Sequence, residues 1–496
     1  MELISGFWNA ISPWNLLYCF LGCMIGTLVG VLPGLGPAAT MAILLPLTGY
    51  LPPAGMILML AGIYYGAMYG GSTTSILINV PGEASSVTTC LDGFRLTKQG
   101  RAGEALAIAA IASFIAGTAG VVFLSICAPV LADFALRFGP PEYFSVLLFS
   151  LTAVLSFSGP NLVKGIITVV LGMLLCSVGL DPLTGKQRFV FGINVLVSGF
   201  DIISIVIGLF GIAEVLSSAE EGIKTIYRGS LGRLIPKGEE LKKGLMGSLR
   251  GTALGLTLGL LPGISPAVAS FMAYDLEKRV SKTPELFGKG RIEGVAAPEA
   301  ANNAVSQAGF IPLMALGIPT CPMLAILLAA FTMYGLTPGP MLFEKHAELA
   351  WTVIASMYVG NVILLILNLP LVALWARISL IPYRILGPLV LGICVVGAFS
   401  MRNNLLDIWV CIIFGFIGYL MKRRDWPAVP FIIGLIIGPM IEQNFRASIG
   451  LSGGDVSIFL MRPISGVFLA LTVLSLILGR RALSLVGKED PGQKYL

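Results

Sequence analysis

The stretch Gly30-Val-Leu-Pro-Gly-Leu-Gly-Pro37 decides the fold of this chain, because it returns as Gly259-Leu-Leu-Pro-Gly-Ile-Ser-Pro266. Each copy lies in a long apolar run and carries the pattern Pro-Gly-x-x-Pro, which interrupts an α-helix. In a lipid bilayer, a broken helix is tolerated only where its freed backbone groups are buried in protein or line a cavity. Two breaks at matching places predict a binding site where two structural repeats meet.

The composition places the chain in a membrane. Of its 496 residues, 56% are hydrophobic and only 12% are charged, and the mean hydropathy is +0.89. Apolar segments long enough to cross the hydrocarbon core, roughly 17 to 25 residues each, recur from Leu16 to Leu478 with short polar connections. The net charge of +6 does not indicate a nucleic-acid partner, because the basic residues fall in the loops. We therefore predict an all-α polytopic membrane protein.

The duplication extends beyond the opening motif. Ile111-Ala-Ser-Phe-Ile-Ala-Gly117 is echoed by Ile354-Ala-Ser-Met-Tyr-Val-Gly360, and Asn79-Val-Pro81 is echoed by Gly317-Ile-Pro319. The order of these landmarks is the same in both halves, and their spacing drifts slightly, as insertions in loops would cause. Chance similarity between glycine-rich helices is the alternative interpretation.

Loop charges indicate how the halves lie in the membrane, since positive residues concentrate in short cytoplasmic loops. The connection from Ser217 to Arg250 is strongly basic, whereas residues 1 to 94 contain no Lys or Arg. We predict two inverted repeats, each with a re-entrant hairpin and about five spans. The predicted divisions are a first repeat over residues 1–216, a basic cytoplasmic linker over 217–244, a second repeat over 245–441, and a final span with a cytoplasmic tail over 442–496.

The expected elements follow from the apolar runs. The hairpins cover residues 16–50, entered from outside, and 245–276, entered from inside; tilted pairs of spans are the alternative for either. The spans are expected near 54–80, 104–127, 143–157, 162–179 and 198–216 in the first repeat, near 297–318, 350–375, 383–399, 405–421 and 428–441 in the second, and near 459–479 at the end.

Polar residues in the first half form a candidate site. The strings Tyr69-Gly-Gly-Ser-Thr-Thr-Ser75 and Asn79-Val-Pro-Gly-Glu-Ala-Ser-Ser86 flank an apolar tripeptide. Small hydroxyl groups and a half-helix N-terminus can bind an anion, and glycine lets a ligand approach the backbone. Close packing of helices through small residues is the alternative.

The second half offers amide and carboxyl side chains. Asn302 and Asn303 follow Ala297-Pro-Glu-Ala-Ala301, and an amide offers a donor to a carboxylate and an oxygen to Na⁺. Hydrogen bonding between helices is the alternative role for both. Glu83 and Glu299 are costly at mid-bilayer, so either is functional if it is buried there and unremarkable if it lies near a mouth of the protein. Because Pro298 suggests a helix start, a first-turn capping role and a proton or cation role are equally open for Glu299.

The sequence lacks the residue patterns typical of metal sites and of phosphate-binding loops. The eight cysteines lie in apolar segments with no Cys-x-x-Cys pair, and His346 is the single histidine, so we interpret the cysteines as small core residues rather than metal ligands. The Gly-rich stretches lack the Gly-Lys-Ser/Thr ending of a phosphate-binding loop. We expect no enzyme activity and no bound cofactor.

The motifs at residues 30–37, 69–75, 79–86 and 100–103, and above all Glu293-Gly-Val-Ala-Ala-Pro-Glu-Ala-Ala-Asn-Asn-Ala304, resemble the large membrane subunit of the tripartite tricarboxylate transporters, the TctA family. The resemblance extends from about residue 15 to about residue 480. It implies a permease of the bacterial inner membrane that works with a small membrane subunit and a periplasmic solute-binding protein. The import of a carboxylate would be driven by Na⁺ or H⁺.

Combining the residues with the resemblance gives ten cavity candidates, although their division between substrate and cation is open. They are Gly34, Gly36, Ser72, Thr73, Asn79, Gly82, Ser265, Asn302, Asn303 and Thr320. One departure is Gly317-Ile-Pro-Thr-Cys321, where the family pattern leads us to expect Gly-Ile-Pro-Gly-Ser. An anion channel with re-entrant loops is the second hypothesis, and an intramembrane enzyme is the third.

Overall fold

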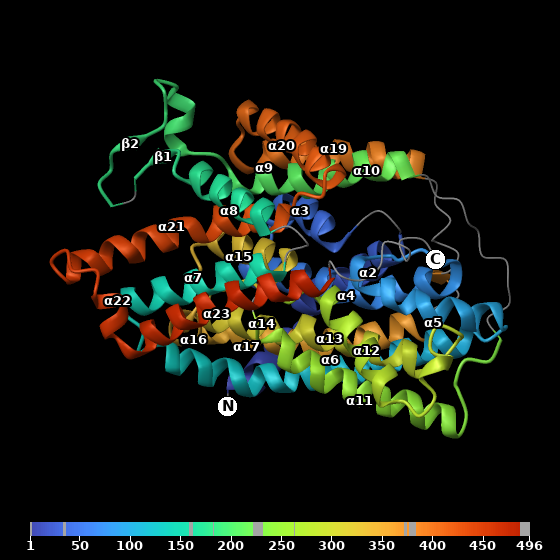
Figure 1. Cartoon of the computed structure of the whole chain (residues 1–496). Coiled ribbons are helices and arrows are strands. Elements are labelled where there is room, and N and C mark those ends of the chain that lie inside the picture. The colour runs from blue at the N-terminus through green and yellow to red at the C-terminus, as the bar shows by residue number, and fades with distance from the viewer. Residues whose placement is uncertain are drawn as a thin grey trace. The chain divides into compact units, whose positions relative to one another are not determined.

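The computed structural model describes residues 2–32, 36–157, 162–181, 183–221, 232–261, 263–371, 374–375 and 383–486. These residues are almost all helical, with one two-stranded antiparallel hairpin (Figure 1). Six helices are long and apolar enough to cross a membrane. The predicted all-α membrane protein is confirmed.

The helices of the first half are bounded as follows. They are α1 (Glu2–Ala10), α2 (Pro13–Val31), α3 (Pro37–Thr48), α4 (Pro53–Ile78), the 3₁₀ turn η1 (Ala84–Ser86), α5 (Val87–Lys98), α6 (Ala102–Ala135), α7 (Pro140–Phe157), α8 (Leu162–Cys176), the strands β1 (Gly179–Leu180) and β2 (Gln187–Arg188), the 3₁₀ turn η2 (Asn194–Ser198), α9 (Ile202–Val206), the π-helical turn η3 (Ile207–Ile212) and α10 (Ala213–Glu221).

The second half contains a similar series. It comprises α11 (Glu239–Gly259), α12 (Pro266–Val280), the 3₁₀ turn η4 (Pro284–Leu286), α13 (Glu293–Ala308), α14 (Phe310–Leu316), α15 (Pro322–Met333), α16 (Pro340–Lys345), α17 (Ala347–Asn368), α19 (Tyr383–Arg402), α20 (Leu405–Arg423), α21 (Ala428–Leu451), α22 (Ile458–Met461) and α23 (Pro463–Val486).

The chain packs as two compact units, and each unit draws on both halves of the sequence. Unit 1 holds residues 1–136 and 203–419, and unit 2 holds residues 137–202 and 420–496. The two predicted sequence repeats therefore do not coincide with the two compact units of the structure. Their inverted relationship in the membrane stays a prediction, as do the predicted domain boundaries.

Glycines allow two helix pairs in unit 1 to approach closely. In the first pair, a Cβ atom on Gly26 of α2 would lie 2.5 Å from the carbonyl oxygen of Ile63 in α4. In the second, a Cβ atom on Gly255 of α11 would lie 2.6 Å from the carbonyl oxygen of Ala301 in α13. Glycines one turn away on either side make matching contacts in both pairs, at Gly22 and Gly30 in α2 and at Gly251 and Gly259 in α11. Side chains of any size would force the helices apart.

The ends of α4 and α14 also correspond to each other, because they have the same backbone conformation. Asn79 ends α4 in the left-handed conformation (φ 59°, ψ 30°), and Gly317 ends α14 in the same conformation (φ 72°, ψ 25°). Four residues later, Glu83 (φ −151°, ψ 169°) and Cys321 (φ −148°, ψ 170°) occupy nearly identical N-cap conformations. The sequence echo of Asn79-Val-Pro81 in Gly317-Ile-Pro319 thus corresponds to one shared backbone path.

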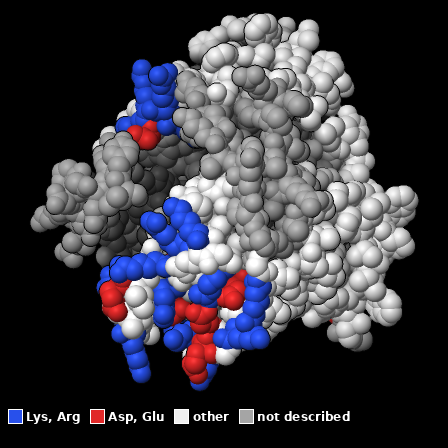
Figure 2. Space-filling model, turned by 90° about the vertical axis from the view of Figure 1, so that its right-hand side faces the viewer, with Lys and Arg blue, Asp and Glu red and all other residues white. Residues whose placement is uncertain are grey.

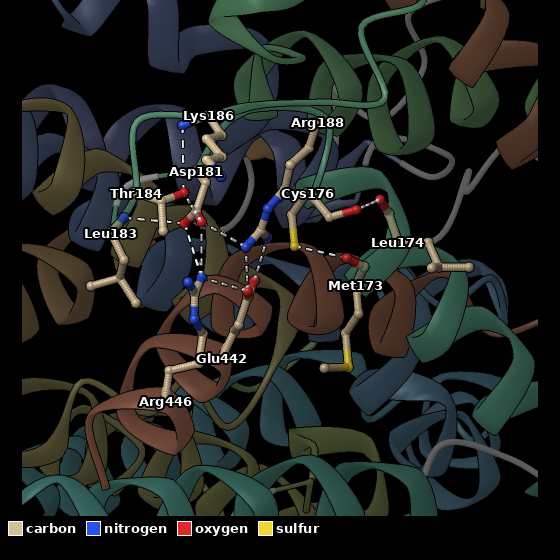
Figure 3. A network of polar contacts seen from close by, with 11 residues as sticks. Met173, Leu174, Cys176, Asp181, Leu183, Thr184, Lys186, Arg188, Glu442 and Arg446 are labelled. Carbon is tan, nitrogen blue, oxygen red and sulfur yellow. Dashed lines mark hydrogen bonds and ion pairs between the residues drawn. The ribbon is translucent and has the colours of Figure 1, made fainter. Parts of the chain in front are cut away.

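Unit 2 consists mainly of α7, α8, α21 and α23, and ion pairs fasten its connecting segments. Arg446 on α21 contacts both carboxylate oxygens of Asp181 at 3.0 Å, and Arg188 on β2 contacts Glu442 at 2.8 Å (Figure 3). Thr184 also donates a hydrogen bond to Asp181. Bonds from Thr184, Arg446 and Arg188 lower the pKa of the Asp181 carboxyl. The network attaches the β1–β2 hairpin to the end of α21.

Charged side chains gather at one end of unit 1. Figure 2 views the right-hand side of Figure 1, where α5, α11 and α12 end, and Lys and Arg side chains crowd the lower part of this face together with acidic ones. The exposed basic residues of α5 and of residues 237–289 are Arg95, Lys98, Lys237, Lys242, Lys243, Lys278, Arg279, Lys282 and Lys289. The positive-inside rule makes this end the cytoplasmic one in the predicted topology.

Several predicted spans are wrong in their bounds: α6 continues to Ala135 and α21 to Leu451, beyond the expected ends near 127 and 441, and α13 differs at its start. We expected a helix starting at Pro298, but α13 begins at Glu293 and includes Pro298 in its interior. The physical reason is Asp92, which accepts hydrogen bonds from the backbone N–H groups of Gly290 and Arg291 at 2.7 Å and so fixes the turn before the helix. Glu299 therefore lies in the middle of α13, and its predicted role as a first-turn capping charge is wrong.

Candidate functional site

Two of the candidates lie on α4, which is buried along almost its whole length. Ser72 and Thr73 are each 4% exposed. The Ser72 hydroxyl donates to the carbonyl oxygen of Tyr69 at 2.8 Å, as hydroxyl groups in apolar helices commonly do. Next to them, Gly71 has no Cβ, and the side chain of Glu83 fills that space.

The link after α4 holds Asn79, Gly82 and Glu83. Asn79 is exposed at the helix end, whereas Gly82 is buried against the backbone of Gly30 and Gly71. Glu83 caps η1, because its carboxylate accepts from the backbone N–H of Ser85 at 2.9 Å. Burial raises the pKa of Glu83 to about 7, although its bonds with Ser85 and Ser86 oppose that rise. Glu83 is thus poised to change charge near neutral pH.

The strongest candidates lie on α13, in the interior of unit 1. Asn302 and Asn303 have no exposed side-chain surface. The Asn303 Nδ2 group donates to Ser113 Oγ on α6 at 2.8 Å, so this amide joins two helices as the alternative interpretation expected. The Asn302 Nδ2 group is 3.5 Å from its acceptor, the carbonyl oxygen of Met68 on α4, which is a weak hydrogen bond. Asn302 is therefore the freer of the two donors.

The glycine and serine candidates of the two Pro-Gly motifs lie at helix starts. Gly36 is the N-cap of α3, no side chain caps that helix, and a Cβ atom there would have nothing within 4 Å. Ser265 is the N-cap of α12 and accepts from the backbone N–H of Val268 at 3.5 Å. Gly34 lies outside the described residues. The start of α3 therefore offers backbone N–H groups that no side chain of the described residues occupies.

Thr320 and Cys321 precede α15. Thr320 is 3% exposed, and its Oγ1 atom lies 2.8 Å from where a Cβ atom on Gly309 would be. Cys321 stands at the N-cap of α15 but forms no side-chain cap, and its sulfur donates to the hydroxyl group of Tyr64 at 3.4 Å. Thr320 and Cys321 therefore occupy the positions equivalent to Gly82 and Glu83 in the first half.

Sequence reasoning missed Thr89, which lies on α5, a helix that we did not predict. The Thr89 hydroxyl donates to the Glu299 carboxylate at 2.5 Å, and Ser72 also interacts with that carboxylate. We call Ser72, Thr89, Glu299 and Asn302 the α4–α13 polar cluster. Helix α5 is short and has an even mixture of polar and apolar residues, so hydropathy gave no signal for it.

A cavity of about 400 Å³ lies elsewhere in unit 1 and contains none of the ten candidates. Its lining includes Asn9, Lys345, His346, Glu348 and Thr352. His346 is exposed, as expected from its charged loop. No group of three or more His, Cys, Asp and Glu side chains in the described part of the chain could hold a metal ion.

Two proteins of Agrobacterium vitis are similar to the chain. An uncharacterized 52.8 kDa protein in the TAR-I ttuC' 3' region is 44% identical over 488 residues, which are 96% of each chain. An uncharacterized protein in the TAR-II ttuC' 3' region is 43% identical over 210 residues, which are 42% of this chain and 87% of that protein.

No solved structure matches the chain. The match that decides the family covers residues 16–433 and therefore most of the sequence, including both Pro-Gly motifs and the whole of the α4–α13 polar cluster. The chain belongs to the tripartite tricarboxylate transporter TctA family.

Proposed function

We propose that the chain is the permease subunit of a secondary transporter that imports a carboxylate, a tricarboxylate or a related organic acid, by cation symport. In this proposal it works in the bacterial inner membrane with a small membrane subunit and a periplasmic solute-binding protein. The two repeats alternate the exposure of one site between the two sides of the membrane. Family membership supports the transporter role, and the remaining features are our inference.

The observation that carries the proposal is the α4–α13 polar cluster, a buried group of neutral and acidic side chains between helices that are otherwise apolar. The Asn302 amide has only a weak hydrogen bond to Met68, so it can donate to a carboxylate without losing a strong partner. The uncapped start of α3 adds free backbone N–H groups and the positive end of a helix dipole.

The proposal is tested by uptake of labelled citrate and of other organic acids into proteoliposomes. We expect Asn302→Ala and Ser265→Ala to lower uptake while membrane insertion stays normal. Asn444→Ala is the matched control for the first variant, because among the described residues the amide of Asn444 on α21 bonds only to the carbonyl oxygen of Met440 in its own helix, at 2.8 Å. Normal uptake by both site variants would contradict the assignment of the site.

A further inference from the structure

Helix α13 carries an unusual surplus of buried acceptors. Four of its side-chain oxygen atoms accept no hydrogen bond from any described residue: Glu299 Oε2, Asn302 Oδ1, Asn303 Oδ1 and Gln307 Oε1. Leaving a buried acceptor unpaired costs roughly 1 to 3 kcal/mol. All four unpaired atoms on this helix are oxygens, so the partner that they lack is a donor or a cation.

A backbone carbonyl oxygen holds each of the two asparagine amides in its orientation. The Ser113 hydroxyl could donate to a turned Asn303 amide, but that amide would then lose its bond to the carbonyl oxygen of Glu299. The Nδ2 atoms of Asn302 and Asn303 face the carbonyl oxygens of Met68 and Glu299, at 3.5 and 3.0 Å. A carbonyl oxygen only accepts hydrogen bonds, so turning either amide would place two acceptors against each other. The orientation of both amides is therefore set by the backbone.

Glu299 differs from the other buried carboxylates among the described residues. Six of them form an ion pair with an arginine, namely Glu104, Glu142, Asp181, Glu277, Glu293 and Asp407. Asp92 has no arginine but accepts four hydrogen bonds, three of them from backbone N–H groups. Glu299 is 1% exposed, and among the described residues its carboxylate has only two neutral hydroxyl partners, those of Thr89 and Ser72. Among these eight buried carboxylates, the charge of Glu299 has the weakest compensation from its partners.

The surroundings of Glu299 gather oxygen atoms from three elements. Thr89 approaches from α5 at 2.5 Å, and Ser72 from α4 interacts with the same carboxylate. Asn302 lies one turn further along α13, on the side that faces Met68 of α4. Carboxylate, amide and hydroxyl oxygens are the ligands that a hard cation prefers.

We propose that Glu299 and Asn302, together with the hydroxyl groups of Ser72 and Thr89, bind one Na⁺ ion. The inference rests on the proposed function, in which a cation gradient drives import. One carboxylate among neutral oxygens suits a monovalent ion, because it neutralises a single charge. A proton would satisfy Glu299 Oε2 and one neighbouring acceptor, whereas Na⁺ accepts several oxygen ligands at once.

The site also gives a physical reason for coupling. An anionic substrate that binds to the Asn302 amide would be repelled by an uncompensated Glu299 carboxylate nearby. Na⁺ at Glu299 removes that repulsion and fixes the Asn302 oxygen, so the amide nitrogen is oriented toward the substrate. By linkage, Na⁺ raises the affinity for the carboxylate and the carboxylate raises the affinity for Na⁺ by the same factor.

The test is Na⁺ binding by the purified full chain in detergent, without any carboxylate. The unfolding temperature is followed by tryptophan fluorescence as NaCl replaces choline chloride at constant ionic strength, with KCl in a parallel series. We expect a saturable rise with Na⁺, because a ligand that binds only the folded state stabilises it. Glu299→Gln should abolish the rise, and Thr89→Val, which keeps the carboxylate, should shift it to higher Na⁺ concentrations.

Glu142→Gln is the matched control, since Glu142 is a buried carboxylate paired with Arg462 in unit 2, and its Na⁺ response should equal that of the unmodified protein. An unchanged response in both Glu299→Gln and Thr89→Val would overturn the site. Stabilisation of the protein by acid with no response to Na⁺ would also overturn the site. The other titratable groups that interact with Glu299 are Glu83 and Cys90. Na⁺ binding without any carboxylate uptake would contradict the proposed function and leave this site standing.

Discussion

Asp92 is the residue whose replacement tests the structure most sharply. Its carboxylate has no exposed surface and fastens α5 to the turn between η4 and α13. Oδ1 accepts from the backbone N–H groups of Gly290 and Arg291 at 2.7 Å, and Oδ2 accepts from Gly288 N–H at 3.1 Å and from the Tyr274 hydroxyl at 2.8 Å. These four bonds hold together segments almost two hundred residues apart in the chain.

Asp92→Asn keeps the shape of the side chain and changes only its chemistry. An amide nitrogen in the position of Oδ2 meets the Gly288 N–H group, so one donor loses its acceptor, at a cost of roughly 1 to 3 kcal/mol. The Tyr274 hydroxyl can turn and accept from the amide. The two bonds to Oδ1 lose the assistance of the negative charge, which makes them weaker. We expect a destabilisation of about 3 kcal/mol in total.

The assay is thermal unfolding of the purified protein in detergent, read as an unfolding temperature and as a half-life at a fixed temperature, because membrane proteins of this size commonly unfold irreversibly. Asp275→Asn is the matched control. Asp275 pairs with Arg279 on the surface of α12, where both side chains are more than half exposed, and such pairs contribute little. Equal effects of the two substitutions would refute the reasoning.

Three further predictions follow from single contacts. Gly255→Ala places a Cβ atom 2.6 Å from the carbonyl oxygen of Ala301 and should destabilise the protein by about 1 to 3 kcal/mol in the same assay, whereas Gly450→Ala, with open space around it, should not. Because the pKa of Glu83 is raised to about 7, its contribution to stability is present at acid pH and lost as the pH rises through 7. Glu83→Gln should therefore flatten that part of the curve of stability against pH, and an unchanged curve would contradict the raised pKa. Cys321→Ser restores an N-cap to α15 and should raise stability by about 0.5 to 1 kcal/mol, and a loss of stability would show that the bond to Tyr64 matters more.

The sequence predicted the long apolar helices well, because α4, α6, α17 and α20 each fill a hydrophobic run of spanning length. It failed where tertiary contacts set the boundaries. The start of α13 depends on Asp92, which is distant in sequence, and α5 has no hydropathy signal. The two compact units also could not be predicted, since each is assembled from both halves of the chain.

The structure places the candidate site residues in different environments. Asn302, Asn303, Ser72 and Thr320 are buried, as a site within the membrane requires. Asn79 is exposed, and the alternative structural roles fit Gly82, which packs against Gly30, and Asn303, which bonds to Ser113. Residue type alone could not separate these roles, because the same glycines and amides serve packing and binding. The assignment of the ten candidates to a substrate stays a prediction.

The central claim is carboxylate import driven by a cation gradient. The most direct measurement reconstitutes the chain with its small membrane subunit, adds candidate solute-binding proteins from the same operon, and follows labelled carboxylate uptake under separate Na⁺ and H⁺ gradients. We predict saturable accumulation against the carboxylate gradient that requires the binding protein and the Na⁺ gradient and ends when that gradient is collapsed. Unsaturable flux that only equilibrates the carboxylate, with no dependence on either gradient, would indicate a channel and contradict the account.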